Sequence, residues 1–320
     1  MTGLSGPQPG AEGRSSPDHD ARPDAPGAGG RSSPEGAGGS SGARSGPSVH
    51  LEPDGRRAPG PEPPAGVPAS EARLFSTASS ATAGIGTAIA GFLVGSVISA
   101  VLVAIVAAAA GLALSGGQPV QVPAVVIANL VGLWVGLTAA VVIASRAWGS
   151  RHAAADFGLR LRPWPDLPLG VAVGLGSQFV LIPLVYLPFR PFYPGLDKTL
   201  SHPAHALTVH ASGAGFVVLG LFIALGAPVV EELFFRGLLL RALDHRLAGL
   251  GRLMGPTAAV VLTGAAFGLA HGEGLVLAVG LGVFGVVLGV MAEGFGRLGP
   301  GIVAHATFNA ATVVALALLR

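Results

Sequence analysis

Two adjacent glutamates and an arginine stand within a part of the chain that is otherwise apolar. These residues are Glu231, Glu232 and Arg236, and long runs without charge surround them. An ionisable side chain at the centre of a membrane span costs about 2.5–3.5 kcal/mol on insertion scales. Because intramembrane charges usually serve a function, this cluster is the first candidate for a functional site.

The spacing of the three residues assigns them different roles. Glu232 and Arg236 are four positions apart, which predicts an ion pair on one helix face. Glu231 is rotated from Glu232 by about 100° around a helix. We therefore interpret Glu231 as the carboxylate that is left for chemistry.

Three further polar side chains occupy the C-terminal apolar segments. His271 lies four positions after Phe267, and His305 lies four positions before Asn309, so each pair occupies one helix face. A glutamate and a histidine can activate water as a general base. A second histidine and an asparagine can donate hydrogen bonds to a developing oxyanion.

Composition indicates the environment of these groups. Half of the 320 residues are hydrophobic and 11% are charged, although the first seventy or so residues contain few apolar runs. The remaining chain contains repeated segments near the length of about 20 residues that a helix needs to cross a bilayer. We predict an all-α, polytopic membrane bundle of about seven spans, at 82–114, 121–145, 166–188, 213–243, 256–271, 274–292 and 299–319.

The chain divides into three predicted parts. Residues 1–75 are rich in Gly, Pro, Ser and Arg and are predicted to form a disordered tail. Residues 76–205 are predicted to hold N-terminal membrane helices, and 206–320 a catalytic membrane domain. No apolar segment at the start resembles a signal peptide, so we expect the tail to remain on the protein.

The distribution of arginine predicts the orientation of the bundle. Positive charge favours cytoplasmic loops. We therefore predict a multi-pass protein of the cell membrane with a cytoplasmic tail and an external C-terminus. The basic loop residues are Arg146, Arg151, Arg160, Arg162, Arg241, Arg246 and Arg252.

At these motifs the sequence resembles the CAAX prenyl protease and bacteriocin-processing family (CPBP, Abi-type) of intramembrane endopeptidases. The resemblance covers about 228–309 and rests on three motifs in family order, with weaker support from the stretch 156–160. The motifs are Glu231-Glu232-x-x-x-Arg236, Phe267-x-x-x-His271 and His305-x-x-x-Asn309.

The resemblance implies a peptidase. The family has been described both as metalloproteases and as metal-free glutamate proteases, and we favour the glutamate type without a cofactor. It implies that Glu231 and His271 activate water, while His305 and Asn309 stabilise the oxyanion. Glu232 and Arg236 would be the supporting ion pair. The implied partners are the lipid bilayer and a peptide or protein substrate, which is lipid-modified in CAAX processing and unmodified in bacteriocin or peptide maturation.

A zinc-dependent protease is an alternative. Catalytic zinc commonly takes two histidines and one carboxylate, and Glu231, His271 and His305 would supply them. The local HExxH signature is missing, so we favour no metal. Straight spans would place His271 near the outer end of its helix, and Glu231 and His305 nearer the inner side. Both the metal-free and the zinc-dependent protease therefore require short or bent helices.

Two other classes compete with the protease. One is a non-enzymatic immunity or scaffold protein that uses the same helices to bind a partner. The other is an ion-coupled transporter with Glu231 as the carrier, although no inverted repeat is visible. The chain contains no cysteine, which excludes a thiolate nucleophile, and no basic patch with interleaved aromatic residues that would indicate nucleic-acid binding.

Overall fold

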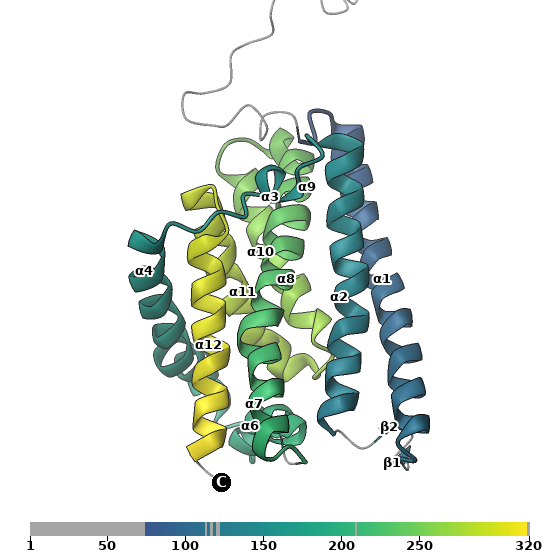
Figure 1. Ribbon diagram of the computed structural model, residues 1–320. Coiled ribbons are helices and arrows are strands. Elements are labelled where there is room, and N and C mark those ends of the chain that lie inside the picture. The colour runs from purple at the N-terminus through teal and green to yellow at the C-terminus, as the bar shows by residue number, and fades with distance from the viewer. Residues whose placement is uncertain (1–73, 113, 116–117, 120–121, 209, 319–320) are drawn as a thin grey trace, which may run out of the picture. The chain divides into compact units, whose positions relative to one another are not determined.

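The computed structural model describes residues 74–112, 114–115, 118–119, 122–208 and 210–318 (Figure 1). The predicted tail therefore lies outside the described residues, except at its last two positions. Leu74 and Phe75, which we had assigned to the tail, are buried. The ring of Phe75 packs against Trp148, with 6.0 Å between centroids. This apolar pair belongs to the bundle because burying it removes hydrocarbon from water.

Each of the seven predicted apolar segments contains a helix, although the helix of the first, predicted over 82–114, ends at Ala109, and Leu114 belongs to a two-residue strand. Six helices are long and apolar enough to cross a membrane, and the seventh, α10, has 17 residues. Five of the seven, including α10, are uninterrupted α-helices. These five are α1 (Ala78–Ala109), α2 (Pro123–Trp148), α10 (Met254–Ala270), α11 (Leu275–Phe295) and α12 (Gly299–Leu318).

The other two long helices each combine several segments. The segments of the helix at 163–189 are α4 (Pro163–Gly176), η2 (Ser177–Leu181), α5 (Ile182–Tyr186) and η3 (Leu187–Phe189). Those of the helix at 213–250 are α7 (Gly213–Leu221), η4 (Phe222–Gly226), α8 (Ala227–Glu232), η5 (Leu233–Leu239), α9 (Leu240–Leu247) and η6 (Ala248–Leu250).

Both composite helices contain a π-helical segment that ends two residues before a proline. The Ile182 N–H donates to Ser177 O, and the Ala227 N–H donates to Phe222 O, each across five residues. Proline lacks an N–H, and its ring clashes with the carbonyl four residues earlier. The wider π turn relieves this clash. At Pro228 the helix therefore shows a local change in register.

Short elements connect the long helices. We had predicted none of these elements as separate units, because each is short or lacks a long apolar run. They are a two-stranded antiparallel ribbon of β1 (Leu114–Ser115) and β2 (Gln118–Pro119), α3 (Ala153–Asp156) and α6 (Leu196–Thr208).

The helices form two flanking pairs around a central group (Figure 1). α1 packs against α2 on one side, α4 packs against α12 on the other, and α10 packs against α11 between them. α3 and α9, which follow or carry basic residues, lie at the same end of the bundle, and the C-terminal end of α12 lies at the opposite end. The arrangement agrees with a multi-pass protein, and its orientation in the membrane stays a prediction.

Two interactions fix the start of α12. Arg297 Nη2 donates to Asp166 Oδ1 at 2.5 Å, joining the residues before α12 to the first turn of α4. The Leu298 N–H donates to Gly158 O at 2.8 Å. Because Gly158 has a positive φ of 67°, glycine suits this turn. These contacts set the depth of α12 in the bundle.

Glycines allow the close approach of α1 and α2. An added Cβ at Gly136 would collide with the carbonyl oxygen of Gly91 and with the backbone of Gly95. Small residues at such positions let backbones approach closely in lipid, where the hydrophobic effect does not drive helix association. Close backbone packing therefore holds α1 against α2.

We predict that Gly136→Ala destabilises the protein by about 1–3 kcal/mol, because the added methyl group overpacks the α1–α2 contact. Thermal unfolding of the purified protein measures this effect. Gly86→Ala is the matched control, since an added Cβ there meets nothing within 4 Å. Equal melting temperatures for the two variants would contradict the close contact.

Candidate active site

The carboxylate of Glu232 is the centre of a buried hydrogen-bond network. Glu232 ends α8, and Arg236 lies one turn later in η5. Arg236 Nη1 donates to Glu232 Oε1 at 2.9 Å, and both side chains are almost fully buried. The structure thus shows the ion pair expected from the spacing, and each charge is compensated by the other.

Arg236 also connects this pair to two other helices. Its Nη2 donates to the backbone oxygen of Gly285 in α11 at 3.0 Å. Its Cζ lies 4.5 Å from the centroid of the Phe267 ring of α10, within the range of a cation–π contact. One guanidinium therefore joins three helices.

His305 of α12 lies between the two glutamates. Its Nδ1 is 3.0 Å from Glu232 Oε1, and its Nε2 is 3.8 Å from Glu231 Oε2. An ionised carboxylate only accepts hydrogen bonds, so Nδ1 carries the hydrogen of the short contact. Glu232 thereby fixes the imidazole plane and directs Nε2 towards Glu231. The His305 side chain is 3% exposed and that of Glu231 is 14% exposed.

Phe267 connects the two histidines. Its ring centroid is 4.8 Å from that of His271 and 5.4 Å from that of His305, and both contacts are edge-to-face. His271 Nδ1 is 2.8 Å from Phe267 O. Because a carbonyl only accepts hydrogen bonds, Nδ1 donates, and the neutral ring keeps its lone pair on Nε2.

The depth of His271 follows from the length of α10. His271 is the C-cap of this helix, whose 17 residues extend about 25 Å at 1.5 Å per residue. This length is less than the hydrocarbon thickness of about 30 Å. The helix is therefore shorter than a full crossing, and the contacts of the Phe267 ring with His271 and His305 place both histidines around one side chain.

Asn309 is held by the helix that carries the glutamates. Its Nδ2 donates to the backbone oxygen of Ile223 in η4 at 2.9 Å. Asn309 lies one turn after His305 on α12. The two side chains of the third motif therefore contact the 213–250 helix at two points, one on either side of Pro228.

The structure brings the predicted residues together to different degrees. Glu231, Glu232, Arg236 and His305 form one contiguous group. His271 joins this group through the ring of Phe267, and Asn309 joins it through the backbone of η4.

Three features were missed by the sequence analysis. The hydrogen bond between His305 and Glu232 joins residues 73 positions apart, and no local spacing indicates it. The acceptor groups on Gly285 and Ile223 are backbone carbonyls, which carry no side-chain signal. The proline after η4 was visible in the sequence, and it could have indicated an unpaired carbonyl nearby.

The zinc alternative was tested against the side-chain positions. Among the described residues, no three side chains of His, Asp or Glu are grouped so that they could hold a metal ion. Glu231, His271 and His305 therefore do not form a ready ligand set in this conformation.

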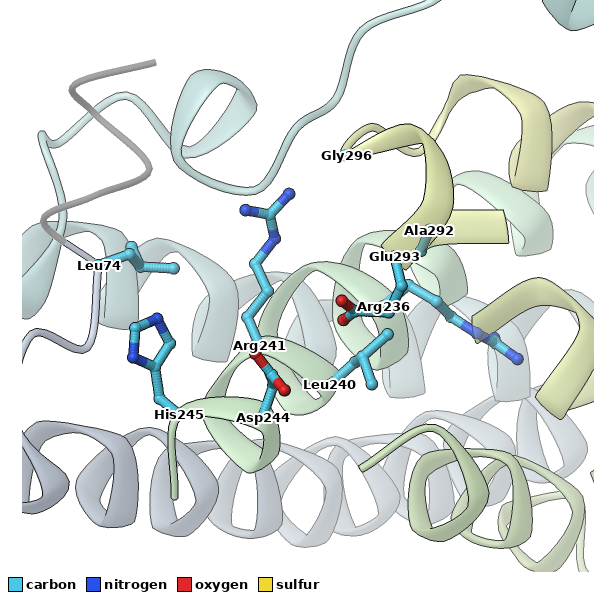
Figure 2. A pocket seen from close by; sticks show the side chains of 9 residues that line it. All are labelled: Leu74, Arg236, Leu240, Arg241, Asp244, His245, Ala292, Glu293 and Gly296. Atoms are coloured by element: carbon cyan, nitrogen blue, oxygen red, sulfur yellow. The ribbon is translucent and has the colours of Figure 1, made fainter. Parts of the chain in front are cut away.

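A polar cavity of about 190 Å³ lies beside the network, between α9 and the end of α11 (Figure 2). Arg241, Asp244 and Glu293 are among the residues that line it. Figure 2 shows that the guanidinium of Arg236 points away from the Arg241 and Asp244 side chains, so its stem forms part of the wall. The lining includes neither Glu231 nor His305, so the cavity meets the candidate site only at the stem of Arg236.

Comparison with protein families identifies the class of this region. Residues 213–311 match the family model described as Rce1-like, type II CAAX prenyl endopeptidase Rce1-like. This match confirms the resemblance that the motifs predicted, over somewhat less than a third of the chain. Comparisons with curated proteins and with solved structures gave no match. The described part of the chain therefore has the helices of a multi-pass membrane protein, and residues 213–311 are similar to type II CAAX prenyl endopeptidases.

We predict that Arg236→Met lowers the free energy of unfolding by about 3–5 kcal/mol, because it leaves Glu232 buried without its counter-charge. Thermal unfolding checks this value, and adding Glu232→Gln to Arg236→Met should recover part of the loss. The matched control is Arg190→Met, which breaks a salt bridge to Asp197 between exposed side chains and should cost about 1 kcal/mol or less. Similar losses for the two single variants would show that Arg236 does not stabilise a buried charge.

Proposed function

We propose that this protein is an intramembrane endopeptidase that hydrolyses peptide bonds with water activated by Glu231 and His271. The observation that carries the proposal is the position of His305, which Glu232 anchors through Nδ1 while Nε2 faces Glu231 at 3.8 Å. The family match of residues 213–311 supports the peptidase class.

The proposed reaction begins with water near Glu231. The carboxylate accepts a proton from water while the water oxygen bonds to the scissile carbonyl carbon, and the carbonyl π electrons move to oxygen. In the second step the oxyanion re-forms the carbonyl, the C–N bond breaks, and Glu231 returns the proton to the leaving nitrogen. His271 assists by accepting a hydrogen bond from the water at Nε2.

His305 and Asn309 would stabilise the oxyanion of the tetrahedral intermediate. His305 can donate from Nε2 when its ring is protonated, because Nδ1 already donates to Glu232. Asn309 has a second hydrogen on Nδ2 that the bond to Ile223 does not use. Donors held in place before the reaction lower the barrier because they need no reorganisation as the charge develops.

Glu232 and Arg236 are positioning residues in this scheme. Their charges compensate each other, so Glu232 can accept the Nδ1 hydrogen of His305 without becoming an unpaired buried anion. Glu231 lacks an arginine contact of this kind among the described residues and faces an imidazole. The two neighbouring carboxylates therefore have different environments, which is the arrangement expected for two different roles.

The proposed substrate is a peptide or membrane-associated protein. The family description favours cleavage beside a lipid-modified cysteine, and maturation of an unmodified peptide is the second version. Both versions predict membrane peptides that accumulate uncut when Glu231 is replaced. A comparison of the peptides from membranes with the wild-type protein and with Glu231→Ala distinguishes them by the presence of a lipid on the cut fragments.

We predict that Glu231→Ala and His271→Ala each abolish cleavage while the melting temperature of the protein is maintained. Asn309→Ala should lower kcat by about a hundredfold or more, the usual loss for one oxyanion donor. Cleavage of a membrane peptide is followed by mass spectrometry. The control is Glu273→Gln, which alters an exposed carboxylate two positions after His271 and should retain wild-type turnover.

Wild-type turnover in the Glu231→Ala variant would refute the proposed base. An immunity or scaffold function would be indicated if partner binding survived replacement of Glu231, His271, His305 and Asn309 in a folded protein. Ion-dependent flux in liposomes would instead indicate a transporter.

We predict that EDTA and phenanthroline leave the rate of cleavage unchanged, because no three described side chains form a metal-binding group. The assay uses protein purified without added metal, with metal content measured alongside. Loss of turnover on chelation, followed by recovery with added zinc, would favour the zinc-dependent version.

A further inference from the structure

The hydrogen bond from Asn309 to Ile223 joins positions 86 residues apart, from α12 to η4. Its length of 2.9 Å is normal for an amide donor and a carbonyl acceptor. Because the Ile223 oxygen can only accept, the nitrogen of the Asn309 amide must face it, and the orientation of the amide is fixed. The backbone of one helix thus sets the direction of a side chain on another.

The Ile223 carbonyl is available because its helical donor is missing in both registers. In the α register its donor would be the Ala227 N–H, but that group donates to Phe222 O. In the π register the donor would be the N–H of residue 228. Position 228 is proline, which has no N–H. The π turn and Pro228 together therefore leave this carbonyl without a backbone partner.

We propose that Pro228 is a positioning residue for Asn309: by lacking an N–H, it reserves the Ile223 carbonyl for the Asn309 amide. The inference rests on the proposed function, in which Asn309 is an oxyanion donor. With one Nδ2 hydrogen bound to Ile223, the amide cannot rotate freely, and the second hydrogen points in a fixed direction. Pro228 is buried and acts on the reaction only through this backbone group.

The chain contains a matched control for this arrangement. η2 ends with the Ile182 N–H donating to Ser177 O across five residues, and Pro183 follows. Pro228 has the same place relative to η4. Pro183→Ala therefore also restores a backbone N–H after a π turn. It does so in the 163–189 helix, which does not take part in the hydrogen bond between Asn309 and Ile223. Any general effect of removing such a proline appears in both variants.

The first experiment measures the coupling without turnover. Melting temperatures are determined for Asn309→Ala in three backgrounds: wild type, Pro228→Ala and Pro183→Ala. In wild type and in Pro183→Ala, the loss of Asn309 leaves the Ile223 carbonyl unpaired, and we expect a decrease of a few degrees. In Pro228→Ala a backbone N–H supplies the carbonyl, so the decrease should be at most half as large. An equal decrease in all three backgrounds would overturn the proposal.

The second experiment measures kcat and KM for the same variants. Pro228→Ala should lower kcat by about tenfold or more with KM unchanged, because a misdirected amide loses part of the stabilisation of the oxyanion. It should lower kcat no further in the Asn309→Ala background, whereas Pro183→Ala should have a small effect in both. An equal loss from Pro228→Ala with and without Asn309 would show that the proline supports only the fold.

The two experiments separate this inference from the proposed function. If the wild-type protein cleaves no peptide, the proposed function fails, while the melting temperatures still report whether Pro228 controls the Asn309 contact. If cleavage occurs and Asn309→Ala is inactive but not coupled to Pro228, the proposed function stands and the positioning role of Pro228 is refuted.

Discussion

The hydrogen bonds that meet at Glu232 Oε1 are the interaction on which the candidate site depends. This oxygen accepts from Arg236 Nη1 at 2.9 Å and lies 3.0 Å from His305 Nδ1. A charge in an apolar interior is stable only with a partner and with further hydrogen bonds. Glu232 makes its contacts through Oε1, with a guanidinium on its own helix and an imidazole on α12, while its buried Oε2 has no hydrogen-bond partner among the described residues. The stabilisation of one buried charge therefore also determines the geometry around Glu231.

Arg236 extends the same constraint to the remaining helices. Its Nη2 donates to the Gly285 carbonyl of α11, and its guanidinium lies over the Phe267 ring of α10. The Phe267 ring in turn contacts His271 and His305. Lysine could not make this combination of contacts, because it lacks a planar fork with several fixed donors. Glu232, His271 and His305, which belong to three different helices, are thus connected through the Arg236 guanidinium and the Phe267 ring.

Much of the fold was predictable because apolar length is a strong signal in a membrane protein. Each of the seven apolar segments contains a helix, and the spacing of Glu232 and Arg236 gave their contact. The contact between His305 and Glu232 was not predictable, since it depends on how deeply α12 sits. That depth is set by the contacts of Arg297 and Leu298 with Asp166 and Gly158, which lie far from α12 in the sequence. The helix α6 and the end of the predicted tail at Leu74 and Phe75 lacked long apolar runs, so hydropathy gave no sign of them.

Irregularities in the helices determine backbone hydrogen bonds that the pattern of side chains in the sequence does not show. In a bilayer each backbone carbonyl needs a partner, because water is not available to supply one. A π turn followed by Pro228 removes the backbone donor of Ile223, and a carboxamide on another helix takes its place. In an uninterrupted α-helix the Ile223 carbonyl would accept from the N–H four residues later, and the Asn309 amide would lack this acceptor. The irregular register of the 213–250 helix therefore determines the orientation of the Asn309 amide. Because Pro228 has no N–H, the Ile223 carbonyl accepts a hydrogen bond from Asn309 in place of one from its own helix.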